Sequence, residues 1–385
     1  MHGRSIDGGD GVPVARPSEV TRPLETARLR GPDFHDIALL DDGEIDAVCL
    51  DGHYRLDRRL GAGGMGFVYA GRELDEERPV AVKILSEGKT AHYPTLSRFL
   101  REAQLGVRIH HRNVVEALDF GSTPEGLVYL VMELLQGEDL GVLIRRHEGL
   151  PWPRVRSLVL QICAGLSALH AIGVVHRDVK PTNCFRVLED GHELVKLLDL
   201  GVATRPDQPG DDLDLDLDGG RTIVGTPQYM SPEQARGETV DERSDVYSTG
   251  IILCELLTGR VPFDGSAQAV LDAQIREEPP SLQRLAPAGM RIDPAVQRIY
   301  ERALAKDPAQ RFASIEELAA AIRAIPCEDP LEISGTYEPV VLPRPEERHP
   351  WRSLAAGLLR GFAVFCRVPA RREPSYEPEE RRPST

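Results

Sequence analysis

The pattern of apolar and polar positions divides the middle of this 385-residue chain into short buried runs and periodic segments. Largely apolar runs predict buried strands at 80–85, 127–135 and 194–198. Apolar residues recur at roughly helical spacing over 96–109, and a second, apolar helix is predicted at 251–257. The strand at 80–85 has a lysine inside it, which is the first position that needs a chemical explanation.

That lysine, Lys83, predicts a carboxylate partner. Burying an ammonium group costs free energy unless an opposite charge pairs with it. Glu102, on the predicted helix at 96–109, is the favoured partner, whereas the glutamates at 73–77 lie in a charged turn. The alternative is a lysine at the strand end that reaches water. We expect a Lys83–Glu102 ion pair, with phosphate groups as the second neighbour of the lysine.

A glycine-rich run lies before this strand, at 60–68. Its glycines Gly61, Gly63 and Gly66 leave no side chains between backbone N–H groups and phosphate oxygens. The same spacing occurs in dinucleotide-binding folds, but those folds place a helix directly after the glycines. Residues 67–70 have the β-branched and aromatic character of a strand. The run therefore favours a strand, a tight turn and a second strand that cover a triphosphate.

A loop at 176–183, with the sequence His-Arg-Asp-Val-Lys-Pro-Thr-Asn, places an acid, a cation and an amide at fixed offsets. Phosphoryl transfer requires a hydroxyl held in line, a metal ion on the phosphates and positive charge beside the transferring group. Asp178 can accept or orient the hydroxyl, Lys180 can offset phosphate charge, and Asn183 can hold Mg²⁺. Asp199, 21 residues after Asp178, is the predicted second metal ligand. The alternative is that an acidic residue at a strand end only stabilises the turn that follows.

In the order and spacing of these motifs, the chain resembles a bacterial (eukaryotic-like, Hanks-type) serine/threonine protein kinase. The resemblance covers roughly residues 54–325 and implies an α+β, two-lobed protein-kinase-like fold. Its small β-rich N-lobe would span 54–135 and its larger helical C-lobe 136–325. ATP and Mg²⁺, with Mn²⁺ as an alternative ion, would be the cofactors. One departure is Leu200, where the family has Phe, but the apolar character is kept.

The resemblance also implies a set of nucleotide-binding residues. Met132 would lie beside the adenine pocket, and the backbone of Glu133 and Leu135 would hydrogen-bond the base. Without the resemblance, Met132 is a core residue, and the two interpretations are compatible. The other expected contacts are Leu60, Gly61, Ala62, Gly63, Gly64, Met65, Gly66, Phe67, Val68, Ala81 and Lys83.

Three further residues would hold the catalytic lobe together. The segment 225–233 is similar to the peptide-docking segment of the family, with Ser231 where many kinases have Ala. Glu233 would be buried and matched by Arg311. Asp245 would brace the catalytic loop through backbone N–H groups, and the alternative of a plain helix N-cap is compatible with that role.

An acidic segment at 211–218 copies the front of a calcium-binding EF-hand loop. Position twelve would be Gly225 instead of Glu, and no flanking helix pair is evident, so a solvated acidic loop is the preferred interpretation. By resemblance, Arg177 would meet a phosphorylated residue of the activation segment. Thr222, close to Thr226, is the favoured acceptor. The aspartates would supply part of the negative charge before any phosphorylation.

Composition narrows the cellular setting. The formal net charge of −15 argues against a general nucleic-acid binder. The six cysteines are scattered and form no CxxC pair, which favours free thiols in a reducing cytosol over a disulfide frame or a zinc site. No secretory h-region opens the chain, and no stretch of about 18 uncharged apolar residues occurs. We expect a cytoplasmic protein.

The two ends differ in composition from the middle. Residues 1–50 are predicted to be a disordered acidic segment. Residues 326–350 are predicted to form a proline-containing linker, and residues 369–385 a disordered tail. Residues 351–368 predict a basic amphipathic helix that is too broken by charge to span a bilayer. This helix would lie peripherally on the inner face of the membrane, dock on the kinase domain, or bind a partner.

An active kinase that phosphorylates protein substrates is the preferred function. Lys180, which can also meet Thr226, and the segment 225–233 indicate Ser or Thr acceptors in place of Tyr. A pseudokinase or scaffold would keep the fold without catalysis, but every expected catalytic residue is present. A small-molecule phosphotransferase would not be expected to carry the 225–233 segment.

Overall fold

A computed structural model of the chain describes residues 48–62, 66–85, 93–124, 126–189, 191–200, 213–215, 221–223 and 226–326. The chain divides into two units, Met1–Thr336 and Tyr337–Thr385, and all described residues belong to the first. The predicted linker beyond Pro326, the amphipathic helix at 351–368 and the tail at 369–385 lie outside the described residues.

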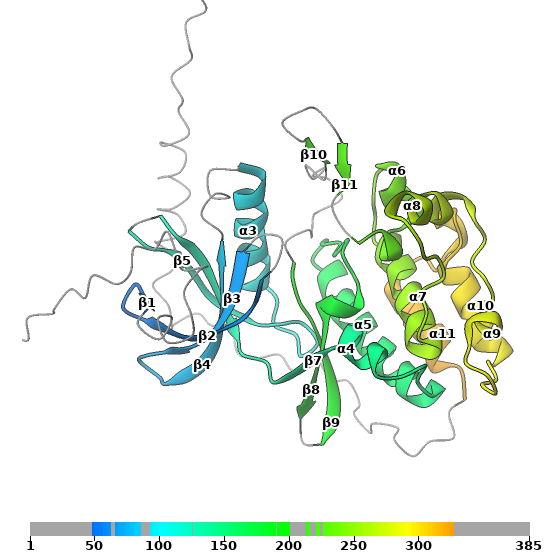
Figure 1. The fold of residues 1–385 in the computed structure, drawn as a ribbon, viewed down its shortest axis with the longest axis horizontal. Coiled ribbons are helices and arrows are strands. Elements are labelled where there is room, and N and C mark those ends of the chain that lie inside the picture. Colours follow the sequence, from blue (N-terminus) through cyan, green and yellow to red (C-terminus); the bar gives the residue numbers. More distant parts are fainter. Residues whose placement is uncertain are drawn as a thin grey trace, which may run out of the picture. The chain divides into compact units, whose positions relative to one another are not determined.

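Apolar strands pair into a six-stranded antiparallel sheet, coloured blue to cyan in Figure 1. Its order is β1-β2-β3-β4-β6-β5, and the strands are β1 (Cys49–Leu50), β2 (Tyr54–Ala62), β3 (Gly66–Glu73), β4 (Arg78–Leu85), β5 (Ala117–Ser122) and β6 (Val128–Glu133). The predicted strands at 80–85 and 127–135 are confirmed as β4 and β6. Side chains alternate across a strand, so Val80, Val82 and Ile84 enter one apolar cluster while Lys83 lies on the opposite face.

Helix α3 (Tyr93–Gly106) packs its apolar residues against this sheet. Phe99 and Ala103 of the helix are fully buried and share a cluster with Leu85 and Leu130 of the strands. The predicted helix at 96–109 is therefore present, but it begins and ends three residues earlier. Its last residue, Gly106, packs closely against β5, since a Cβ atom added there would lie 2.7 Å from the Cβ of Ala117.

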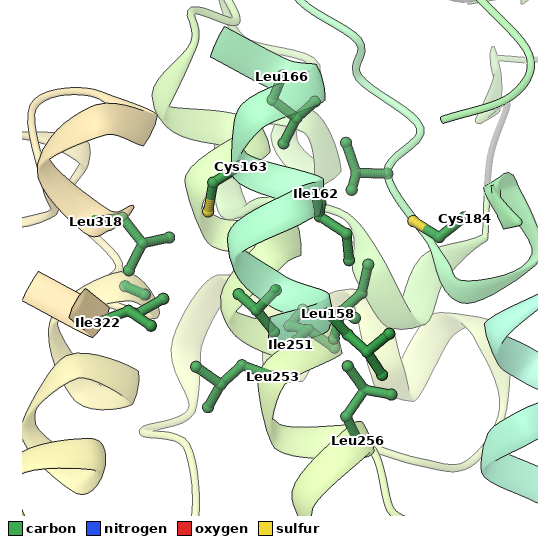
Figure 2. Packing of buried hydrophobic residues seen from close by; sticks show 14 of the residues in the cluster. Leu158, Ile162, Cys163, Leu166, Cys184, Ile251, Leu253, Leu256, Leu318 and Ile322 are labelled. Atoms are coloured by element: carbon green, nitrogen blue, oxygen red, sulfur yellow. The ribbon is translucent and has the colours of Figure 1, made fainter. Parts of the chain in front are cut away.

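The C-terminal part of the described chain is helical. Its α-helices are α4 (Leu140–Arg145), α5 (Trp152–His170), α6 (Pro232–Arg236), α7 (Arg243–Thr258), α8 (Ala267–Arg276), α9 (Leu282–Leu285), α10 (Pro294–Ala303) and α11 (Ile315–Arg323). The predicted helix at 251–257 is the last half of α7, which ends at Gly259 in a left-handed conformation (φ 70°). Figure 2 shows the core in which α5, α7 and α11 meet through Leu158, Ile162, Leu166, Ile251, Leu253, Leu256, Leu318 and Ile322.

A three-stranded sheet has the order β7 (Gly137–Asp139), β8 (Cys184–Glu189) and β9 (His192–Leu197); β7 follows the first sheet in the chain, and β8 and β9 come after α5. The β8–β9 hairpin closes with Glu189 paired to His192. β9 is also hydrogen-bonded to the segment after α3. The N–H of Leu197 donates to Asn113 O (2.8 Å) and the N–H of Val115 donates to Leu197 O (2.9 Å). This ladder joins the segment between α3 and β5 to the strand that leads to Asp199.

Strand β1 corrects the predicted N-terminal boundary. Residues 1–50 were expected to be disordered, but Cys49 and Leu50 pair with Arg55 and Tyr54 of β2. Val48 and Leu50 are buried in the same apolar cluster as the sheet, and Tyr129 donates to Asp51 at 2.6 Å. Two apolar residues in a polar segment were too weak a pattern to predict a strand. Residues 1–47 lie outside the described residues.

A buried ion pair joins α6 to the segment before α11. The guanidinium of Arg311 donates to both carboxylate oxygens of Glu233, at 2.7 and 2.8 Å, and to the backbone carbonyls of Ala305 and Arg243. The Arg311 side chain is 0% exposed and that of Glu233 5%. Burial alone raises the pKa of Glu233, but the bonds from Arg311 outweigh it and the pKa is lowered. The predicted contact between these two residues is therefore formed.

We expect Arg311→Met to destabilise the protein by about 3–5 kcal/mol, because it leaves the Glu233 carboxylate buried without its partner. The matched control is Arg112→Met, since Arg112 and Glu189 form an exposed pair at 3.4 Å. The control should cost less than about 1 kcal/mol. Urea unfolding of the three proteins gives both differences, and equal small losses would contradict the prediction.

Candidate active site

The start of the loop at 176–183 is held by one buried carboxylate. Asp245 is fully buried in the first turn of α7, and it accepts the backbone N–H of His176 and of Arg177, each at 2.9 Å. Its Oδ2 also lies 2.7 Å from Nε2 of His170, at the end of α5. The N-cap of α7 is Glu242, so the alternative of Asp245 as a plain N-cap is wrong. Asp245 instead connects the helical core to the loop.

Asp178 lies in this loop between a cation and an amide. Lys180 donates to its Oδ2 at 2.7 Å, and the Asn183 amide donates to its Oδ2 at 3.0 Å and its backbone carbonyl at 2.9 Å. Pro181 begins a 3-10 turn (Pro181–Asn183) that brings Asn183 back towards Asp178. Arg177, directly before Asp178, has a left-handed backbone (φ 66°), which costs free energy in a residue that is not glycine. The loop is thus a strained conformation kept by several polar contacts.

Lys83 joins three elements of the site. Its Nζ lies 2.9 and 2.7 Å from the two carboxylate oxygens of Glu102 on α3, and 3.1 Å from Oδ1 of Asp199 after β9. Burial lowers the pKa of Lys83, but the two carboxylates outweigh it and the net shift is upward. Burial of Glu102 raises its pKa to about 7, against the opposing effect of Lys83. The predicted Lys83–Glu102 pair is formed, and Asp199 joins it.

The residues expected to hold a metal ion lie on adjoining segments. The N–H of Leu198, next to Asp199, donates to the carbonyl of Asn183 at 2.8 Å. The Asn183 amide nitrogen is turned to Asp178, so the amide oxygen is the group left for a cation. One carboxylate and one amide suit Mg²⁺, which commonly takes one or two protein oxygens together with phosphate oxygens and water. Among the described residues no cluster of three or more His, Cys, Asp or Glu side chains forms a larger metal site.

The glycine run has two kinds of glycine. A Cβ at Gly66 would lie 1.9 Å from the carbonyl oxygen of Ile84, so β3 and β4 approach too closely there for any side chain. A Cβ atom at Gly61 would have no neighbouring atom within 4 Å. Gly61 and Ala62 pair with Val68 and Phe67 across the β2–β3 hairpin, as predicted for a strand–turn–strand. Gly63, Gly64 and Met65 lie outside the described residues, and Leu60 is exposed.

The segment between the two sheets is where the adenine base was predicted to bind. Met132 and Glu133 end β6, and Met132 pairs with Ala81 of β4, which brings two expected nucleotide contacts side by side. The N–H of Glu133 donates to Glu116 O at 3.0 Å, so a base contact at this residue would use its carbonyl. Leu135 follows in the irregular segment before β7.

Comparison with known proteins decides the family. The family model described as "Protein kinase domain" matches residues 54–321 of the chain. The chain belongs to the protein kinase family. Serine/threonine-protein kinase pkn3 of Myxococcus xanthus is 40% identical over 274 residues, which cover 71% of this chain and 50% of that protein. PknB of Mycolicibacterium smegmatis is 37% identical over 276 residues (70% and 42%), and PrkC of Bacillus subtilis 34% over 275 (71% and 40%).

Solved structures agree with the kinase fold. The kinase domain of Mycobacterium tuberculosis PknI is 28% identical, with a TM-score of 0.56, and the match covers 72% of this chain and 98% of that one. The α+β, two-lobed kinase fold is thereby confirmed. The chain spans half or less of the length of the three curated relatives named above.

The activation segment of this kinase domain is partly described. β10 (Leu213–Leu215) pairs antiparallel with β11 (Arg221–Ile223), with Asp214 opposite Thr222. The acidic segment was expected to be a solvated loop, so these strands are a correction for its central residues. The Leu-Asp alternation has the period of a strand, and that signal could have predicted the hairpin.

Several residues that support the site were not predicted from the sequence. His170 was not singled out, although it supports Asp245, and neither was Gln234, whose Nε2 donates to Arg177 O at 2.7 Å. Lys196 of β9 was also missed; it donates to Oε1 of Glu133 at 2.7 Å. Each partner is distant in sequence, so no local pattern signals the contact.

His170 predicts a pH-dependent contribution to stability. Burial lowers the pKa of His170, but the hydrogen bond and charge of Asp245 outweigh it and the pKa is raised above 6.5; Glu242 lies 4.0 Å from the other ring nitrogen. A raised pKa stabilises the fold fully below the unfolded value of about 6.5, and the benefit is lost as pH rises through the folded pKa. The lowered pKa of Asp245 acts only at lower pH.

The free energy of unfolding of the wild type should therefore exceed that of His170→Gln by more at pH 6 than at pH 9. Urea unfolding at the two pH values measures the difference. Comparing the two proteins at each pH removes the contribution of other titrating groups. A gap that is the same at pH 6 and pH 9 would show that the imidazolium charge is not involved.

Proposed function

We propose that the chain is an ATP-dependent serine/threonine protein kinase. The observation that carries the proposal is Lys83, whose ammonium group is bonded at once to Glu102 of α3 and to Asp199 beside the catalytic loop. Kinases require this Lys–Glu pair and the metal-binding Asp to be in place together. The named relatives are serine/threonine-protein kinases, which supports the same acceptor class.

The roles of the residues follow from their positions. The substrate hydroxyl oxygen attacks the γ-phosphorus, its proton passes to Asp178, and the bond from the γ-phosphorus to the bridging oxygen of ADP breaks. Lys180, 2.7 Å from the Asp178 carboxylate, places a positive charge beside the transferring group. Lys83 orients the nucleotide phosphates. Bound Mg²⁺, held by Asn183 and Asp199, would neutralise the phosphate charge.

The acceptor side favours a protein substrate. The predicted docking segment is described from Thr226, which precedes a 3-10 turn (Pro227–Tyr229), to Glu233 in α6. Ser248 of α7 donates to the carbonyl of Tyr229, and the Tyr229 hydroxyl donates to Glu255 at 2.6 Å. A segment held this firmly, followed in α6 by Gln234 bonded to the Arg177 carbonyl, supports an extended peptide acceptor over a small molecule. The scaffold alternative loses support because the catalytic side chains are already in mutual contact.

We expect Asp178→Asn to lower phosphorylation of a generic basic protein about 10²–10⁴-fold, because the amide cannot take the hydroxyl proton. The assay uses radiolabelled ATP and Mg²⁺. The matched control is Asp272→Asn, an exposed position on α8, which should keep wild-type activity. Equal activity of Asp178→Asn and the wild type would reject the proposed function.

Regulation through the activation segment is a second part of the proposal. Arg177 is nearly buried beside Asp178, and β10 places Asp214 opposite Thr222 in the strand register. Negative charge from the aspartates is thus close in the chain to the predicted phosphoacceptor. Thr226, the other regulatory prediction, begins the docking segment.

If the aspartates supply charge before phosphorylation, Thr222→Ala should keep substantial kinase activity. Replacing the acidic residues of 211–218 with Asn should reduce activity several-fold. The measurement is the initial rate with radiolabelled ATP for both variants, alongside mass spectrometry of position 222. The reverse order of activities would show that phosphorylation of Thr222, and not the aspartate run, provides the charge.

The proposals for where the protein is located and what its C-terminal segment contacts come from the sequence. Within the described ranges, none of the helices is both long and apolar enough to cross a bilayer. The basic amphipathic segment 351–368 lies outside those ranges, so we propose it as a site of peripheral membrane, intramolecular or partner contact on its composition alone.

A further inference from the structure

The peptide bond between Arg177 and Asp178 sets the direction in which the catalytic carboxylate enters the site. A peptide unit is planar, so the carbonyl of Arg177 and the N–H of Asp178 turn together. Asp245 holds the N–H groups of His176 and Arg177, which fixes the chain up to Arg177. Rotation of the next peptide plane would move Asp178 and leave those two bonds intact. Lys180 and Asn183 hold Asp178 from its C-terminal side, and a restraint on the Arg177–Asp178 plane itself must come from elsewhere.

The side chain of Gln234 supplies a contact to that plane. Its Nε2 donates to the carbonyl of Arg177 at 2.7 Å. At the other end of the plane, the N–H of Asp178 makes a longer contact of 3.3 Å with Nδ1 of His176. The shorter bond is therefore the one from Gln234. It reaches the strained residue from α6, whereas Asp245 reaches it from α7.

The orientation of the Gln234 amide is itself determined by Ser231. Ser231 is the N-cap of α6 and Gln234 is the third helical residue, and together they form a capping box. The N–H of Ser231 donates to Oε1 of Gln234 at 3.0 Å, and the Ser231 hydroxyl lies 3.1 Å from the same oxygen. A reversed amide would place two donors against each other at Ser231 and two acceptors at Arg177. The amide nitrogen must therefore face the catalytic loop.

We propose that Gln234 is a positioning residue for phosphoryl transfer, which it assists by fixing the Arg177–Asp178 peptide plane. The proposal rests on the proposed kinase function. It also gives a role to the serine at position 231, where many kinases have alanine, because the fully buried hydroxyl accepts the backbone N–H of Gln234 and completes the capping box. The docking helix α6 and the catalytic carboxylate are then connected by one side chain.

The test compares Gln234→Met with the wild type. Methionine keeps the length of the side chain and suits a helix, but it has no N–H donor. We expect kcat to fall about tenfold through misplacement of Asp178. The KM for ATP should stay unchanged, because Lys83 and Glu102 are not touched. Gln234→Glu, which keeps an acceptor for Ser231 and opposes the Arg177 carbonyl, should lower kcat at least as much.

A readout independent of activity accompanies the kinetics. Hydrogen–deuterium exchange of the peptide that contains residues 176–180 should be faster in Gln234→Met than in the wild type. The matched control is Gln310→Met, at an exposed position in the 3-10 turn Pro308–Gln310. This substitution should change neither kcat nor the hydrogen–deuterium exchange of residues 176–180. Thermal unfolding of each variant shows whether it is folded.

The outcomes separate the inference from the proposed function. An inactive wild type would reject the kinase function, while the exchange rates would still decide whether Gln234 holds the loop. An active wild type with unchanged kcat and exchange in Gln234→Met would overturn the positioning role. A lower melting temperature together with a raised KM for ATP would also overturn it, because it would show a general structural role.

Discussion

The arrangement of the site depends on one buried carboxylate. Asp245 has no contact with water, so its charge must be balanced by donors from the protein. It accepts the backbone N–H groups of His176 and Arg177 and pairs with His170. These bonds keep the pKa of Asp245 low despite burial. Because α7 crosses the centre of the helical core, the carboxylate transfers the rigidity of that core to a loop with no regular structure.

A second set of charges connects that loop to the sheet. Lys83 reaches Glu102 and Asp199 across elements that are far apart in sequence. The backbone ladder between β9 and the segment that follows α3 acts in parallel with the side chains, since it holds Leu197 close to Asn113. Nucleotide phosphates and metal would therefore enter a site whose positive and negative groups are already paired. Such preorganisation lowers the reorganisation needed at the moment of transfer.

Much of the site was predictable because its chemistry leaves local marks. A lysine inside an apolar strand requires a carboxylate partner, and Glu102 lies on the predicted helix that follows the strand. The loop at 176–183 carries its acid, cation and amide within eight residues. Contacts that complete the site were not predictable in this way. His170, Gln234 and Lys196 are ordinary polar residues whose partners lie on other elements, and their importance appears only when the chain is folded.

The sequence determined which residues carry the chemistry, which strands and helices form, and to which family the chain belongs. Periodicity and composition act over a few residues, so they predict elements and motifs well. The tertiary structure decided how the motifs support one another: that Asp245 braces the loop instead of capping its helix, that β1 extends the sheet, and that α6 reaches the Arg177 carbonyl. These are hydrogen bonds between distant segments, and packing of the whole core brings their donors and acceptors within 3 Å of each other.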